Sequence, residues 1–151
     1  MKSEFYEEKA KKYNLPDYDK ANREFFLEEI ENCDSMKKIS EKMLEKLQKY
    51  GELLEGFLNT DGNSLAVLIE TKSINESGRE KLSMLYREII ILERSMLICN
   101  LEPSDDSYAK FVKECYEKWT KLKPDLLHFV EKLKNAWKEE INVREELGYL
   151  G

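Results

Sequence analysis

The chain has 151 residues, enough to bury a continuous hydrophobic core without disulfide bonds or a structural metal, and we expect one domain over residues 1–151. Charged residues make up 37% of it and the net charge is −6, a balance that disfavours binding to nucleic acid mainly through phosphate groups. No run of 18 apolar residues is present, so we expect no transmembrane helix, and the charged N-terminus is unlike a signal peptide.

The three cysteines give no sign of a disulfide framework. Cys33, Cys99 and Cys115 are odd in number and form no CxxC pair. Isolated cysteines of this kind are typical of reduced thiols in the cytosol. We therefore expect a cytoplasmic protein.

The first predicted element is a short helix that Ser3 caps and that ends near Tyr13. The segment NLPDYD, residues 14–19, then predicts a turn. Asp17 or Asp19 is expected to cap the next helix.

A long helix is predicted over residues 19–58, because apolar residues recur there every three or four positions. The segment NCDS, residues 32–35, offers cap residues that would break it. We favour continuity, since the apolar stripe does not change phase at that point. The stripe consists of Tyr18, Phe25, Phe26, Cys33, Met36, Ile39, Met43, Leu47, Tyr50, Leu54 and Phe57.

A turn follows in the segment NTDGNS, residues 59–64. Residues 65–77 fit either a helix start or a short buried strand. Ser77 and Glu80 then have capping-box spacing, which predicts a helix that begins or restarts there and runs to Asn100.

The last long helix is predicted after the segment NLEPSDDS, with Ser104 or Asp105 as its cap. Pro124 lies inside it, on the side away from the apolar stripe, and is expected to kink it. The stripe consists of Tyr108, Val112, Cys115, Trp119, Leu122, Leu126, Val130, Leu133, Trp137 and Ile141.

These elements predict an all-α fold, an antiparallel bundle of three long helices plus a short N-terminal helix. The alternative layout has breaks at residues 32–35, 74–77 and 124, which divide the chain into five shorter helices.

The predicted helix over residues 78–100 has more apolar surface than one buried face needs. Met84, Ile91 and Ile98 lie seven residues apart, on the side opposite the main apolar arc. One interpretation is that the N-terminal helix, with Phe5, Tyr6 and Tyr13, covers them. The other is that they form the interface of a dimer.

Two glutamates lie on predicted apolar arcs. Glu93 falls within the main arc of its helix, where a carboxylate must be paired, hydrogen-bonded or protonated. Glu29 lies at the same height in the predicted long helix. Either each glutamate is paired with a lysine or a tyrosine hydroxyl, or the two together hold a divalent metal or share a proton.

No motif for catalysis or cofactor binding is present. The chain lacks the phosphate-binding patterns GxxxxGK[ST] and GxGxxG. A di-iron site needs Glu-x-x-His twice, and the single histidine, His128, follows no such glutamate and lies on an outer helix face. We expect no catalytic residue, no metal and no cofactor, and we place Trp119 and Trp137 in the core.

Lysines form two stripes that glutamates interrupt. Alternating charge of this kind is typical of a solvated helix face with ion pairs one turn apart. A weak track of phosphate contacts is the alternative interpretation for Lys38, Lys42 and Lys49, and for Lys110, Lys121 and Lys132.

The sequence therefore favours a non-enzymatic interaction or assembly module that binds another protein or a second copy of itself, with no membrane role. One alternative is a helical accessory subunit of a nucleoprotein complex, acting through the lysine stripes. The other is a metal-binding or hydrolase bundle centred on Glu29 and Glu93.

Overall fold

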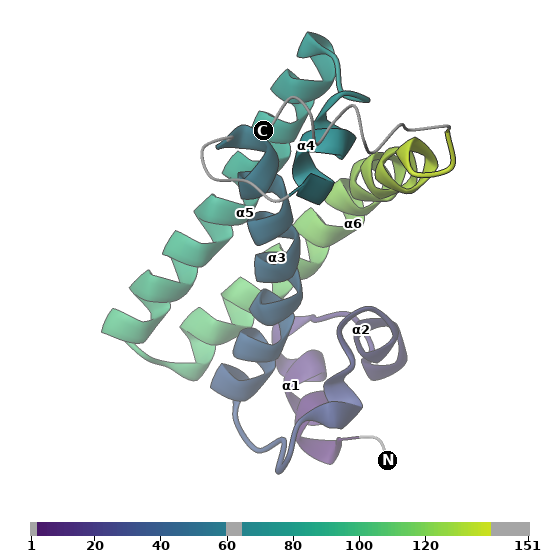
Figure 1. Ribbon diagram of the computed structural model, residues 1–151. Helices are drawn as coiled ribbons and strands as arrows, with labels where there is room; N and C mark the ends of the chain where they lie inside the picture. Colours follow the sequence, from purple (N-terminus) through teal and green to yellow (C-terminus); the bar gives the residue numbers. More distant parts are fainter. Residues whose placement is uncertain (1–2, 60–64, 140–151) are drawn as a thin grey trace.

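The computed structural model describes residues 3–59 and 65–139, and every regular element in these two ranges is helical (Figure 1). The predicted all-α bundle with three long helices and a short N-terminal helix is confirmed. In chain order the elements are α1 (Glu4–Tyr13), α2 (Tyr18–Phe25), the 3-10 turn η1 (Leu27–Glu29), α3 (Met36–Leu58), α4 (Leu65–Thr71), α5 (Glu76–Leu101) and α6 (Asp105–Ala136).

The three long helices α3, α5 and α6 pack against one another and enclose the core (Figure 1). Helices α1 and α2 lie at one end of this bundle, and the short helix α4 lies at the other end against α3 and α6. The core is apolar, with fully buried side chains such as Leu47 of α3, Ile89 of α5 and Val112 of α6. None of the helices among the described residues is both long and apolar enough to cross a membrane.

Each long or N-terminal helix begins at a polar side chain that accepts a hydrogen bond from the backbone three residues later. The predicted caps Ser3, Asp17 and Ser104 are confirmed. Asn75 caps α5 in place of the predicted Ser77. Ser35 caps α3, at a position where we favoured an unbroken helix.

The prediction of one helix over residues 19–58 is wrong. Helix α2 ends at Phe25. The next residue, Phe26, has a left-handed backbone with φ 56°, and its N–H donates to the Asn22 carbonyl. The turn η1 and the segment before Ser35 then separate α2 from α3. The apolar stripe keeps its phase because both helices bury side chains in the same core, so periodicity alone does not show the break.

The other uncertain segments are now assigned. Residues 65–71 form helix α4, not a strand, and a break precedes Asn75. Helix α6 runs through Pro124 from Asp105 to Ala136. The alternative layout was therefore right at residues 32–35 and 74–77 and wrong at residue 124. The predicted turn at 59–64 lies almost entirely outside the described residues.

Candidate functional site

The inner face of α5 packs on α3 and α6, which leaves the outer face to solvent. The buried side chains of α5 are Leu82, Leu85, Ile89, Leu92, Met96 and Cys99. Met84, Ile91 and Ile98 lie on the other side and are 69%, 38% and 67% exposed. These three residues remain uncovered by any described element.

Of the two interpretations of this surface, the one in which the N-terminal helix covers it is wrong, because α1 packs against α2 and α6. Tyr6 is buried there, and its hydroxyl donates to the Pro16 carbonyl at 2.7 Å. The Tyr13 hydroxyl donates to Asp106 Oδ1, also at 2.7 Å. Tyr6 and Tyr13, which we expected to pack against α5, therefore hold α1 against the segment that leads into α2 and against the start of α6.

Exposed apolar and basic side chains alternate along the outer side of α5. The steps between them are three and four residues, which places them along one face of a helix. Arg87 forms no ion pair within the described part of the chain, and Arg94 lies 3.7 Å from the carboxylate of its neighbour Glu93. We call this surface the α5 outer face; it consists of Met84, Arg87, Ile91, Arg94, Leu97, Ile98 and Leu101.

A groove between α5 and α6 adjoins this face. Its cavity has a volume of about 680 Å³, and Met84, Leu85 and Leu122 supply apolar parts of its wall. Ion pairs cross the groove, one between Lys118 and Glu88 and one between Lys81 and Asp125 at 3.0 Å. Because Met84 belongs to both surfaces, the groove is continuous with the α5 outer face.

The two predicted buried carboxylates do not form a shared site in the structure. The side chain of Glu93 is 24% exposed and lies beside Arg94. Glu29 lies in η1, not in a long helix, and accepts a 2.8 Å hydrogen bond from Lys42, which lowers the pKa of the carboxyl. No cluster of three or more potential metal ligands is found among residues 3–59 and 65–139.

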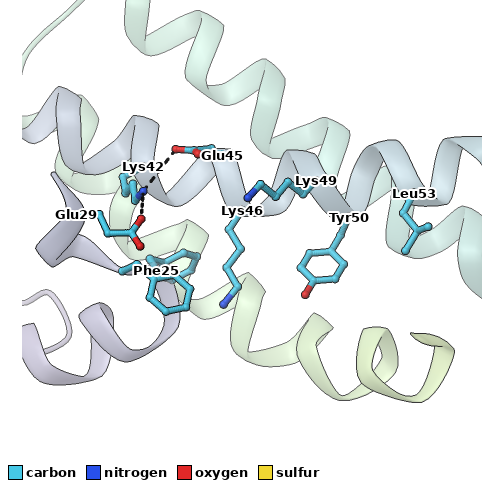
Figure 2. Close-up of a pocket in the computed structure, with 9 residues that line it drawn as sticks. Phe25, Glu29, Lys42, Glu45, Lys46, Lys49, Tyr50 and Leu53 are labelled. Atoms are coloured by element: carbon cyan, nitrogen blue, oxygen red, sulfur yellow. Dashed lines mark hydrogen bonds and ion pairs between the residues drawn. The ribbon is translucent and has the colours of Figure 1, made fainter. Parts of the chain in front are cut away.

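A second cavity lies where the α2–η1 segment meets α3. Its volume is about 490 Å³, and Figure 2 shows Phe25 and Glu29 on one side of it and a row of α3 side chains on the other. We call it the lysine pocket; it is lined by Phe25, Phe26, Glu29, Lys42, Glu45, Lys46, Lys49, Tyr50 and Leu53.

Lys46 is the central cation of the lysine pocket. Its ammonium lies 4.7 Å from the ring centroid of Trp119, 5.8 Å from that of Phe25 and 5.4 Å from that of Phe26. It also donates a hydrogen bond to the Glu24 carbonyl. Burial lowers the pKa of Lys46, and the nearby charge of Glu24 opposes that shift.

The predicted lysine stripe has three different environments. Lys38 donates to Asp34 Oδ1 at 2.7 Å and to the Asn32 carbonyl at 2.9 Å, outside the pocket. Lys42 binds Glu29 and also lies 3.8 Å from Glu45. Lys49 lines the pocket without an ion pair among the described residues.

Sequence reasoning missed Lys46, although its position, one turn from both Lys42 and Lys49, is a signal that could have identified it.

Of the two tryptophans, only Trp119 is in the core. It is buried, and its Nε1 donates to Glu24 Oε2 at 2.7 Å. The placement of Trp137 in the core is wrong: it follows the end of α6 with its ring 44% exposed, and it hydrogen-bonds to Glu70 of α4. His128 is exposed, as predicted.

Comparison of the chain with protein-family models, with curated proteins and with solved structures found no match. Function must therefore be inferred from the residues and their geometry.

Proposed function

We propose that this protein is a non-enzymatic interaction module whose α5 outer face binds an acidic amphipathic helix of another protein. The observation that supports this is the exposed row in which Met84, Ile91 and Ile98 alternate with Arg87 and Arg94. An amphipathic helix binds its partner through apolar residues spaced three and four apart, and the apolar residues of this row have the matching spacing. Glutamates beside the apolar row of the partner would complement the arginines.

A second copy of this chain is a poorer occupant. Parallel pairing of two α5 helices places each arginine opposite its own counterpart. Antiparallel pairing centred on Ile91 brings Arg87 of each copy level with Ser95, one residue from the Arg94 of the other copy. Both arrangements bring like charges together at the seam, which destabilises the pair.

The groove beside Met84 strengthens the choice of an acidic partner. Lys118 and Lys81 in its wall are already paired with Glu88 and Asp125, but Lys121 and Arg87 have no such partner within the described residues. An apolar side chain of the partner can enter between Leu85 and Leu122, while an acidic one meets Arg87. Buried anchors of this kind dominate the energy of most interfaces.

The other two functions have less support. Lys38 forms an ion pair with Asp34, and Lys42 forms ion pairs with Glu29 and Glu45. These pairs weaken the case for a phosphate-binding track along α3. A carboxylate site at Glu29 and Glu93 depended on one long helix that placed the two residues at the same height, and Glu29 lies instead in the short turn η1.

The test uses two labelled synthetic helices that differ only in charge. Both carry leucines at steps of three and four, flanked by glutamates in one peptide and by lysines in the other. We expect fluorescence anisotropy to show binding of the acidic peptide, with at least a tenfold preference of about 1.4 kcal/mol over the basic one. Equal binding of the two peptides would contradict the proposal.

The variant Ile91→Asp places a charge in the centre of the interface and should abolish binding of the acidic peptide. Leu127→Asp, which alters an exposed leucine of α6, is the matched control and should bind normally. Sedimentation of the wild-type protein should show a monomer. A dimer that Ile91→Asp dissociates would replace the proposed partner with a second copy.

A further inference from the structure

Phe26 occupies a backbone position that ordinarily favours glycine. Its φ of 56° lies in the left-handed region, where a side chain destabilises the backbone relative to glycine. The position immediately after the end of a helix is often glycine for this reason. Burial offsets only part of this cost, since the Phe26 side chain is 49% exposed. Its ring forms one wall of the lysine pocket.

The charges of the lysine pocket are only partly balanced. Three lysines and two glutamates line it, and Lys42 engages both Glu29 and Glu45. The remaining two cations, Lys46 and Lys49, form no ion pair within residues 3–59 and 65–139. The Glu24 carboxylate acts on Lys46 from nearby without forming an ion pair, and the ammonium contacts aromatic rings and one carbonyl oxygen. These stabilise an ammonium less than a carboxylate does at contact distance.

Aromatic and apolar side chains border these two cations. Tyr50 points into the cavity from α3, one residue after Lys49 (Figure 2). It packs against Trp119 with ring centroids 5.7 Å apart, so its orientation is held from behind. Leu53 extends the apolar wall by one turn of α3. The pocket thus combines flat apolar surfaces with ammonium groups, in a volume typical of small-molecule sites.

We propose that the lysine pocket binds a small organic anion that carries a flat apolar ring. The ring packs between Phe26 and Tyr50, and the anionic group accepts hydrogen bonds from Lys46 and Lys49. Phosphate, sulfate and carboxylate groups share this chemistry. The left-handed Phe26 then has a role that glycine at the same position would not fulfil.

The probe is 1-naphthyl phosphate, with 1-naphthol and inorganic phosphate as its two halves. Isothermal titration of the full chain should show the intact probe binding at least about tenfold more tightly than either half, since each half loses one set of contacts. Equally tight binding of naphthol would show a merely apolar surface, and equally tight binding of phosphate a simple anion site. Either result overturns the proposal.

Lys49→Ala and Phe26→Gly test the two walls separately. Lys49 is exposed, so its variant should fold, and it should bind the probe about tenfold more weakly. Phe26→Gly relieves the backbone and should lose binding while the melting temperature stays level or rises. Lys110→Ala, which removes an exposed lysine of α6, is the control and should bind as wild type does. Wild-type affinity in both pocket variants would refute the site.

Discussion

Glu24 joins α2 to α6 through one carboxylate. Its side chain is only 18% exposed, and it accepts hydrogen bonds from Trp119 Nε1 at 2.7 Å and from Lys123 Nζ at 2.8 Å. Burial raises the pKa of this carboxyl. The hydrogen bonds from Lys123 and Trp119 together lower the pKa by more than burial raises it, so it lies below its ordinary value. The charged form of Glu24 therefore stabilises the fold.

Stability should depend on pH through Glu24. A carboxyl whose pKa is depressed in the folded state contributes stability above its unfolded pKa, about 4.5, and loses it as pH falls through the folded pKa. At pH 7, Glu24→Gln should lower the free energy of unfolding by about 1–3 kcal/mol, because its partners lose a charged acceptor. Thermal melts between pH 7 and pH 3 should show the gap between wild type and variant closing at the acid end.

Glu117→Gln is the control for this experiment, since Glu117 is an exposed residue of α6. Its melting temperature should stay close to that of wild type at each pH. A Glu24→Gln gap that is unchanged down to pH 3 would show that the charge of Glu24 is not the source of the stability.

At the scale of helices, the starts could be predicted from the sequence better than the breaks. Ser3 could be identified as a cap, and Asp17 and Ser104 each as one of two candidates, because a capping bond joins residues only three apart. The break after α2 was missed because Phe25 and Met36 enter the same core and keep the stripe in phase. The break begins at Phe26, whose backbone is left-handed, and the spacing of apolar residues does not indicate backbone conformation.

The same distinction separates the two candidate sites. The α5 outer face follows from the period of a single helix, so Ile91 and its neighbours seven residues away could be identified in advance. The lysine pocket depends on the turn at Phe26, which brings Glu29 next to Lys42. The Tyr50 ring in its wall packs against Trp119, which is distant in sequence. Such a site can be identified only from the tertiary structure, not from the sequence alone.

Gly51 lies where α3 packs closely against α5. A Cβ atom added there would lie 3.1 Å from Ile89 Cγ2, whereas the nearest described contact at Gly56 would be 3.9 Å. Gly56→Ala should therefore stabilise the protein by about 0.5–1 kcal/mol through helix propensity. Gly51→Ala should be less stable than Gly56→Ala by about 1–2 kcal/mol, because overpacking opposes the same gain.

Urea denaturation of both glycine variants measures this difference. Because Ile89 is fully buried, its methyl group has little room to move away. Equal stabilisation by the two substitutions would show that α5 can shift outward without loss.

Helix α6 carries Pro124 in its interior, where proline lacks the N–H that would bond to the preceding turn. Pro124 is exposed, so its ring contributes little to the core. Pro124→Ala should raise the free energy of unfolding, by up to about 3 kcal/mol if α6 needs no bend there. Thermal melting checks the sign. A lower melting temperature would mean that the proline holds α6 in a bent path that its packing requires.

At the scale of the whole molecule, the charge of the α5 outer face differs from that of the protein as a whole. The protein is acidic overall, with net charge −6, yet the α5 outer face exposes two arginines among apolar side chains. The all-α class could be predicted from composition and periodicity alone. Which face remains uncovered could not, because it depends on α1 and α2 packing at the end of the bundle (Figure 1).

The attachment of the N-terminal helices to α6 has a consequence for synthesis. The bonds that hold them join distant residues: Lys9 to Asp105, Tyr13 to Asp106 and Glu24 to Lys123, the last pair 99 positions apart. A ribosome adding 5–20 residues per second takes roughly 5–20 s to cover that interval. Throughout it, Phe25 lacks the ring of Trp119 on which it packs. Helices α1 and α2 are thus synthesised well before α6, on which their native contacts depend, and nascent chains expose their aromatic residues until α6 is made.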